Sequence, residues 1–207
     1  MYTGKKVVQV ARKGFEDNVG KTIEGAKNTD IAILVIGDPL VATTHHIILQ
    51  EARRQGIQYQ VFHSSSIFSA AIGESGLDIY KFGPTTTVPF WYSNYKPTSF
   101  VDVIEKNLKN GQHTLLLLDI NQTSLEPMGL EDAASIMGAS MHKGGGLSRD
   151  TRLLVMGDIG RDSQKVAYAK VEFLRAMASG FKGMVLCMII PGKTNFAEDD
   201  ELSRFSD

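Results

Sequence analysis

Cysteine is almost absent from this sequence, and long apolar runs are missing. The one cysteine, Cys187, lies in the apolar run of residues 184–190. A single cysteine excludes an intrachain disulfide framework and suggests a reducing compartment. A lone buried cysteine usually acts as a small hydrophobic residue of the core. No stretch reaches the roughly 18 apolar residues that span a bilayer, and residues 1–6 lack the apolar core of a signal peptide. We therefore expect a cytoplasmic protein with no membrane partner.

An excess of charge of either sign is also missing. The 207 residues include 22 lysines and arginines against 23 aspartates and glutamates, which gives a formal net charge of −1. This balance provides no basic face for nucleic acid, so we expect no nucleic-acid partner. The length allows one or two domains, and the ordinary apolar and charged fractions indicate a globular protein with a substantial core.

Signatures of several catalytic classes do not occur. The sequence has no Gly-x-Ser-x-Gly elbow of a serine hydrolase. Three glycines at residues 144–146 lack the Gly-Lys-Ser/Thr ending of a phosphate loop and indicate a flexible connection instead. No cysteine or carboxylate pattern completes a zinc site around the five histidines, which are His45, His46, His63, His113 and His142. We expect neither a metal nor a covalent catalytic triad.

The first part of the chain shows the pattern of a βαβ unit. Residues 31–36 form a short apolar run, typical of a strand buried on both faces of a parallel sheet. Residues 44–55 have apolar side chains at helical spacing, with Gly56 where a C-terminal cap belongs. Residues 59–62 predict the second strand, and the crossover between the two should be right-handed. Around this unit we expect a further strand at residues 5–10 and helices at residues 15–27 and 67–71.

The composition changes near Gly83, where we place a domain boundary. Threonines, prolines and aromatic residues gather after it, and Pro89 argues against a central strand there. We therefore predict an α/β fold with two domains, an N-terminal one over residues 1–83 and a C-terminal one over residues 84–207. In the second domain we expect strands at residues 114–118, 153–156, 165–170 and 184–190, helices at residues 99–110, 130–140 and 171–178, and an exposed acidic tail at residues 198–207.

The strongest candidate site follows the strand expected at residues 31–36. Residues 35–46 read Val-Ile-Gly-Asp-Pro-Leu-Val-Ala-Thr-Thr-His-His, and ligands of open α/β sheets bind at the carboxyl ends of strands. Gly37 allows a ligand to approach the backbone, and the Asp38 carboxylate could accept hydrogen bonds from amine or hydroxyl groups. From the residues alone, an ordinary tight turn with an Asp or Thr cap accounts for the pattern equally well, because Gly-Asp-Pro is common in turns.

A second candidate follows the strand expected at residues 59–62. Three serines, Ser64, Ser65 and Ser66, could bind a ligand there or cap the next helix, and capping is the commoner role of any one serine. Two strand-end loops side by side favour a shared pocket.

Ordered motifs along the chain match one known family. They are Gly-Asp-Pro-x-x-Ala-Thr-Thr-His at residues 37–45, His-Ser-Ser-Ser-Ile at residues 63–67, Tyr-Lys-Phe-Gly at residues 80–83, Phe90-Trp91, Pro-Thr-Ser-Phe at residues 97–100, the run at residues 110–120, and Pro191-Gly192. In this order they resemble the diphthine synthases, S-adenosylmethionine-dependent methyltransferases of the tetrapyrrole methylase type. Family members begin with a strand and a glycine-rich loop ahead of the point where Met1 stands. We therefore expect an incomplete N-terminal domain that lacks this first βα unit and binds the cofactor weakly.

The resemblance implies two α/β domains with S-adenosylmethionine (S-adenosyl-L-methionine) in the cleft between them, in a homodimer. It also implies methylation of a modified histidine on translation elongation factor two, a step of diphthamide biosynthesis. No catalytic residue follows from it. Carried over position by position, the cofactor contacts fall at Asp38, Val41, Ser66, Ile67, Leu118, Met156 and, at the last strand, near Leu186. Val41 stands where the family often has glycine, and Leu186 where it often has histidine.

The methyl donor is already activated, so catalysis would come mainly from positioning the reactants, in line with the missing triad. Two other interpretations stay open. The chain could be another methyltransferase of this fold, acting on a tetrapyrrole or on ribosomal RNA, or a truncated fragment that only dimerises or docks on a partner. The aromatic residues Phe90, Trp91 and Tyr92 fit a dimer interface, and they fit a cover over the core of the second domain nearly as well.

Overall fold

The computed structural model describes residues 4, 7–10, 14–15, 17–121, 123–141 and 145–206. The chain folds as two compact units, Met1–Ser66 and Ile67–Asp207, called here the N-terminal unit and the sheet unit. The domain boundary expected at Gly83 lies inside the sheet unit and stays a prediction about the two domains of the family. Every helix of the described residues is too short or too polar to cross a membrane.

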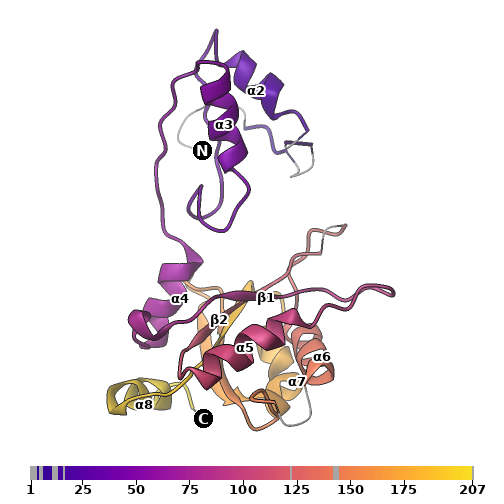
Figure 1. Cartoon of the computed structure of the whole chain (residues 1–207), viewed down its shortest axis with the longest axis vertical. Helices are drawn as coiled ribbons and strands as arrows, with labels where there is room; N and C mark the ends of the chain where they lie inside the picture. The colour runs from indigo at the N-terminus through magenta and orange to yellow at the C-terminus, as the bar shows by residue number, and fades with distance from the viewer. Residues whose placement is uncertain are drawn as a thin grey trace. The chain divides into compact units, whose positions relative to one another are not determined.

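One open, mixed sheet forms the centre of the sheet unit (Figure 1). Its spatial order is β1-β2-β5-β3-β4, with β1 parallel to β2 and every other neighbouring pair antiparallel. The three inner strands are almost entirely buried, whereas the edge strand β4 is mostly half-buried. The strands are β1 (Thr86–Val88), β2 (Thr114–Leu118), β3 (Arg152–Gly157), β4 (Lys165–Lys170) and β5 (Leu186–Ile190). The predicted α/β class and the four strands predicted after residue 110 are confirmed.

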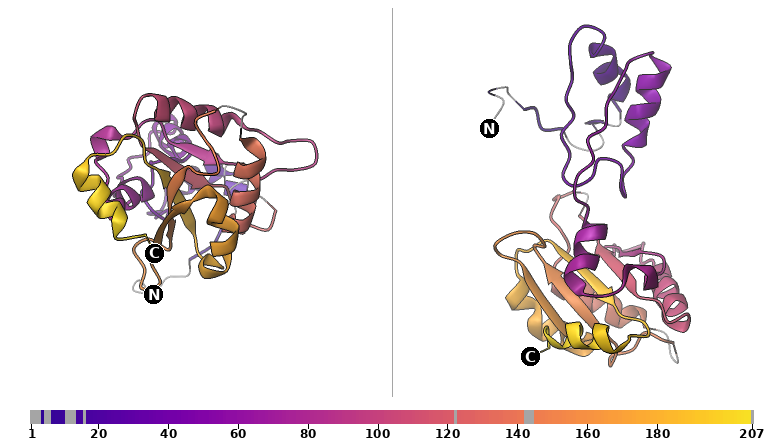
Figure 2. Two further views of the ribbon diagram at one scale, coloured as in Figure 1. Left: turned by 90° about the horizontal axis from the view of Figure 1, so that it is seen from below. Right: turned by 90° about the vertical axis from the view of Figure 1, so that its left-hand side faces the viewer.

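Helices cover both faces of this sheet (Figure 2). Side chains of a strand alternate between faces, so Leu116 and Val155 enter one core while Leu115 and Leu154 enter the other. The first core is closed by α5 (Ser99–Lys109), α6 (Leu130–Ser140) and α7 (Leu174–Met177), the second by α4 (Ile67–Ser75) and α8 (Phe196–Ser203). Cys187 is buried in the second core as predicted.

The helices predicted at residues 99–110 and 130–140 are confirmed as α5 and α6. The single helix expected at residues 171–178 is instead three short pieces, the 3-10 helix η2 (Val171–Phe173), α7, and the 3-10 helix η3 (Ala178–Phe181). A third short 3-10 helix, η1 (Ile79–Lys81), follows α4. The prediction that Pro89 does not lie in a central strand is confirmed, because β1 is an edge strand and ends one residue before Pro89.

The exposed acidic tail expected at residues 198–207 is confirmed only in part, because Asp199 and Asp200 are exposed but Glu198 and Leu202 are buried. Residues Phe196–Ser203 form α8, and the side chain of Glu198 is only 3% exposed, while Leu202 packs in the second core. The Asn195 side chain accepts hydrogen bonds from the N–H groups of Ala197 and Glu198, and the Glu198 carboxylate accepts one from the Asn195 N–H. This reciprocal capping box fixes the start of the helix.

The described elements of the N-terminal unit include the helices α2 (Val19–Gly25) and α3 (His46–Arg54), and its described residues include no β-strand. The strands predicted at residues 31–36 and 59–62 are therefore wrong, as is the strand predicted at residues 5–10 over its described part. A strand needs hydrogen-bonded neighbours and a covered face, and the small cluster of Val19, Ile23 and Ala52 covers neither run. The helices predicted in this unit are present with shorter bounds.

Candidate functional site

Asp38 joins the two loops that the sequence singles out in the N-terminal unit. Its Oδ1 accepts a hydrogen bond from the Leu40 N–H at 2.9 Å. Its Oδ2 lies 2.8 Å from Nδ1 of His63 and accepts a hydrogen bond from the Ser64 N–H at 3.3 Å. The side chain of Asp38 is 6% exposed, whereas that of His63 is 68% exposed. The expected meeting of the two loops is thus present, with the carboxylate between them.

These hydrogen bonds also favour the ionised form of the Asp38 carboxyl. The hydrogen bond from the Leu40 N–H, together with those from His63 and the Ser64 N–H, lowers the pKa of the Asp38 carboxyl, although burial acts in the opposite direction. The group is therefore ionised at neutral pH and can accept hydrogen bonds from a cationic or hydroxyl group of a ligand.

The backbone of this loop has the shape that its sequence requires. Gly37 has a φ of +79°, a left-handed conformation that glycine adopts without a steric penalty. His45 Nδ1 lies 3.0 Å from the Pro39 carbonyl, which can only accept, so the ring donates and closes the turn. Val41 lies in this turn and is 42% exposed. Asp38, Val41 and Ser66 are the three predicted cofactor contacts of the N-terminal unit.

The other four predicted contacts belong to the sheet unit, and three of them lie at one end of its sheet. Leu117 of β2 pairs with Cys187 of β5, so Leu118 and Leu186 come next in this register. On the other side of β5, Met156 of β3 also pairs with Cys187. Leu118 and Leu186 face the first core, whereas the fully buried Met156 faces the second. Because these three predicted contacts lie here, we label this place, at the carboxyl ends of β2 and β3 and the start of β5, the cofactor end of the sheet.

The remaining predicted contact, Ile67, stands at the start of α4 and is 38% exposed. It is the first residue of that helix, and Phe68 and Ala71 of the helix pack in the core that contains Met156. The helix that begins with Ile67 therefore packs on the same core as Met156.

Asp158 is a residue of this end that the sequence analysis missed. It stands directly after β3 and accepts hydrogen bonds from the Val185 N–H at 3.0 Å and the Ser163 hydroxyl at 2.8 Å. A signal for it was present, because Gly157-Asp158 after an apolar run repeats the order Gly37-Asp38.

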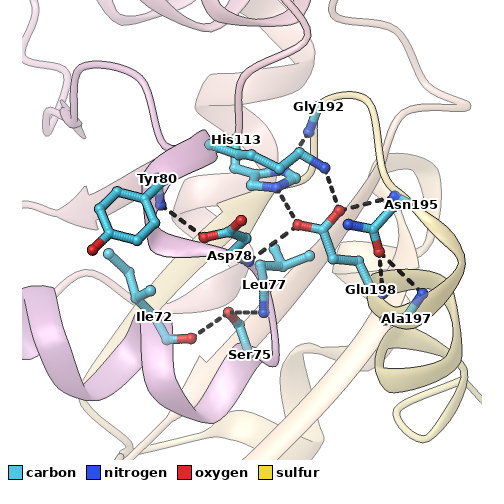
Figure 3. Close-up of polar contacts among 11 residues, drawn as sticks. Ile72, Ser75, Leu77, Asp78, Tyr80, His113, Gly192, Asn195, Ala197 and Glu198 are labelled. Carbon is cyan, nitrogen blue, oxygen red and sulfur yellow. Dashed lines mark hydrogen bonds and ion pairs between the residues drawn. The ribbon is translucent and has the colours of Figure 1, made fainter.

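A second polar cluster occupies the opposite end of the sheet, before β2 and after β5 (Figure 3). Its centre is the Glu198 carboxylate. One oxygen accepts hydrogen bonds from His113 Nε2 at 2.9 Å and from the Asp78 N–H at 3.1 Å. The other accepts from the Asn195 N–H at 2.9 Å and from the ammonium group of Lys81. The cluster therefore joins three segments that are distant in the sequence.

His113 is held in one neutral form within this cluster. The Gly192 N–H donates to His113 Nδ1 at 2.8 Å, so this nitrogen has no proton, and Nε2 donates to Glu198. Burial lowers the pKa of His113, more than the neighbouring carboxylate raises it. Burial also tends to raise the pKa of Glu198, but the hydrogen bonds from Lys81, the two N–H groups and His113 outweigh it and lower the pKa to about 2. We interpret this cluster as a structural clamp of α8.

The four histidines that the structure describes do not form a metal-binding group. Over the described ranges, no three His, Cys, Asp or Glu side chains are placed to hold a metal ion. His142 lies outside the described residues, as do Lys143 and Gly144 at the start of the expected glycine connection. Burial raises the pKa of the Cys187 thiol to about 12, which removes it as a nucleophile at neutral pH.

Comparisons with known proteins agree with this arrangement. Residues 2–174 match the family described as tetrapyrrole (corrin/porphyrin) methylases. The chain is 39% identical over 203 residues to the diphthine synthase of Methanocaldococcus jannaschii, which covers 96% of this chain and 78% of that relative. It is 41% identical over 202 residues to the diphthine synthase of Methanococcus maripaludis strain C6, and the match covers 96% of this chain and 77% of that relative. A crystal structure of diphthine synthase matches with a TM-score of 0.86 at 33% identity, over 99% of this chain and 76% of that structure.

Proposed function

Since this chain belongs to the tetrapyrrole methylase family, we propose that its acceptor is the modified histidine of translation elongation factor two. The chain is an S-adenosylmethionine-dependent methyltransferase of the diphthine synthase type, which places it in diphthamide biosynthesis. The observation that carries the proposal is the identity of about two residues in five with diphthine synthases over 96% of the chain.

The residues proposed to hold the cofactor are Asp38, Val41, Ser66, Ile67, Leu118, Met156 and Leu186. Their chemistry suits an adenosyl amino acid. The ionised Asp38 is an acceptor for amine or hydroxyl groups, and the half-buried Leu118 adds apolar surface at the cofactor end, where a flat base could pack. When bound, S-adenosylmethionine supplies a methyl group that its sulfonium charge already activates.

The chain's own contribution is then to bind and orient two reactants and to exclude water from between them. Orientation of this kind contributes up to about 7–11 kcal/mol in well-aligned reactions. No covalent nucleophile is required, in agreement with the buried and unreactive Cys187. An amine acceptor has to be neutral when it reacts, and water can take its proton.

The homodimer and the cytoplasmic location are part of the same proposal. Between Trp91 and Pro97 the chain doubles back, with reciprocal backbone hydrogen bonds between Tyr92 and Tyr95 at 3.0 and 3.1 Å. Tyr95 is 63% exposed, and Tyr92 nearly half exposed, while Phe90 and Trp91 pack on the first core. The two exposed tyrosines supply aromatic surface of the kind that is enriched at interfaces. Light scattering that shows a stable monomer at high concentration would refute the dimer.

The experiment for the acceptor is methyl transfer in a purified system. Elongation factor two is isolated from cells that lack diphthine synthase activity, and labelled S-adenosylmethionine is added with this chain. We expect label in the factor, and none in a factor whose target histidine is replaced. Cofactor binding without transfer would contradict the proposed acceptor, whereas no binding in calorimetry would contradict the proposed cofactor.

A further inference from the structure

One carboxylate fixes the turn between β3 and β4. Asp158 follows Gly157, the last residue of β3, and its backbone has a φ of +50°. Its Oδ1 accepts a hydrogen bond from the Val185 N–H at 3.0 Å, and its Oδ2 accepts one from the Ser163 hydroxyl at 2.8 Å. Its own N–H donates to the Val185 carbonyl at 2.9 Å. The side chain, which is 10% exposed, therefore joins the end of β3 to the residue that precedes β5.

This junction lies beside two of the proposed cofactor contacts. Leu186 is the next residue after Val185, and Met156 stands two residues before Asp158. Gly157, between them, pairs with Leu186 in the sheet. A change in the position of Asp158 would therefore be transmitted to both contacts through the backbone.

A second connection runs from the same turn to α4. The Gln164 side-chain oxygen accepts a hydrogen bond from the Gly160 N–H at 2.7 Å, and its amide donates to the Glu74 carboxylate at 2.7 Å. Glu74 belongs to α4, whose first residue, Ile67, is another proposed contact. The turn over residues 158–164 thus ties together the three elements that bear these contacts.

Asp158 is suited to act as a permanent clamp. The hydrogen bonds from the Val185 N–H and the Ser163 hydroxyl lower the pKa of its carboxyl, so it is ionised at neutral pH and accepts on both oxygens. The left-handed backbone is uncommon for a residue other than glycine, although aspartate tolerates it better than most. Such conformations persist where surrounding contacts hold them, and they cluster at functional sites.

We propose that Asp158 is a positioning residue for the cofactor, which fixes the cofactor end of the sheet without touching the cofactor itself. The inference rests on the proposed function, because it assigns Asp158 a role toward the same cofactor contacts. It differs from a purely structural role in one respect: loss of the carboxylate should weaken cofactor binding more than it weakens the fold.

The test uses the full chain and matched variants. Asp158→Gly removes the carboxylate and keeps a left-handed backbone free of strain. Asp158→Asn keeps the shape and a carbonyl that can accept from the Val185 N–H. Leu125→Gly is the control, because Leu125 also has a positive φ, +58°, in the same unit, but is 65% exposed. Binding of S-adenosylmethionine is measured by calorimetry, and stability by urea unfolding.

We expect Asp158→Gly to weaken binding about tenfold or more, Asp158→Asn to recover most of the affinity, and Leu125→Gly to bind like the parent chain. In turnover, Asp158→Gly should raise KM for the cofactor and leave kcat nearly unchanged. Unchanged affinity in Asp158→Gly overturns the inference, and so does a loss that merely follows lost stability. If Asp158→Gly does not fold, Ser163→Ala decides, because it removes one bond to the carboxylate and should still weaken binding measurably. Absence of binding by the parent chain is a separate result, which refutes the proposed function.

Discussion

Similar apolar segments have opposite fates in the two units of this molecule. Residues 114–118 and Leu186–Ile190 are inner strands of the sheet, almost wholly buried between two layers of helices. Residues 31–36, which are just as apolar, are mostly exposed in the N-terminal unit, where Leu34 is 74% exposed. Their backbone makes no hydrogen bond with another residue that the structure describes.

The comparison shows that an apolar run becomes a strand only where it has neighbours. In the sheet unit, β5 has β2 on one side and β3 on the other, and both faces are covered. Each of these contributions is non-local, so the run itself cannot supply them. The following predictions test how far this contrast extends, beginning with the largest effect.

The widest contrast is expected in amide hydrogen exchange. Amides of β2 and β5 should exchange only through global unfolding, which for a typical domain requires about 5–15 kcal/mol. Amides of residues 31–36 and 59–62 should exchange at nearly the rate of an unpaired chain. Native-state exchange followed by mass spectrometry measures both. Equal protection in the two regions would show that the N-terminal runs have partners after all.

The next contrast concerns ion pairs. Glu198→Ala should lower the free energy of unfolding by about 3–5 kcal/mol, because it leaves Lys81 and the buried His113 N–H without their acceptor. The matched change in the N-terminal unit, Glu51→Ala, removes the contacts with Arg54, whose side chain is 72% exposed, and should have a much smaller effect. Urea denaturation followed by circular dichroism compares the two. A larger loss in Glu51→Ala would reverse the interpretation of Glu198 as the clamp of α8.

Replacing a leucine with alanine should likewise cost much more stability in the sheet unit than in the N-terminal unit. Leu154 is fully buried in β3, and Leu154→Ala should cost about 2–5 kcal/mol of stability. Leu34→Ala removes the same atoms from an exposed position and should stay within about 0.5 kcal/mol. Urea unfolding followed by circular dichroism, which detects the helices of both units, measures both variants, and fluorescence of Trp91, the only tryptophan, follows the sheet unit alone. Comparable costs would indicate that Leu34 is buried in solution.

The smallest expected effect is a dependence on pH. Burial lowers the pKa of His113 below its ordinary 6.5, so below that pH the unfolded chain binds a proton that the folded chain excludes, and stability falls. The hydrogen bonds to Glu198 lower its pKa from 4.5 to about 2 against the effect of burial, so its contribution is complete above pH 4.5 and is lost toward pH 2. We expect a decline in two stages in urea midpoints between pH 7 and pH 2.5. Glu198→Gln should make the lower stage shallower, while Asp38 and Asp158, whose pKa values are also lowered, keep part of it; an unchanged lower stage would contradict this account.

The sequence was informative where local pattern and tertiary contacts agree. The strands of the sheet unit were predictable, because side chains such as Leu115 and Leu116 enter opposite cores and need to be apolar on both faces. Glu198 was not, although its capping box with Asn195 is local, because its partners His113 and Lys81 are 85 and 117 residues away. A charged residue near a chain end is usually exposed, and only the folded structure shows this one enclosed.

In the candidate site too, single positions could be predicted from the sequence, whereas contacts between distant residues could not. Single positions such as Asp38 and Leu118 could be proposed from motifs, since a strand end followed by a polar turn is visible in the sequence. That Leu118, Met156 and Leu186 share one end of the sheet depends on the antiparallel register of β5. The proposed role of Asp158 depends on its hydrogen bond with Val185, which is 27 residues away, so no short sequence motif contains both residues.

The burial of Cys187 has a practical consequence for experiments in solution. Its thiol, which has a pKa of about 12 and a residue exposure of 2%, should not react with maleimides or iodoacetamides at neutral pH. In a labelling reaction the native chain therefore behaves as though it had no cysteine. A single Val41→Cys substitution, at an exposed position among the proposed cofactor contacts, would carry a fluorophore at that place alone. The arrival of S-adenosylmethionine could then be followed in real time as a change in emission.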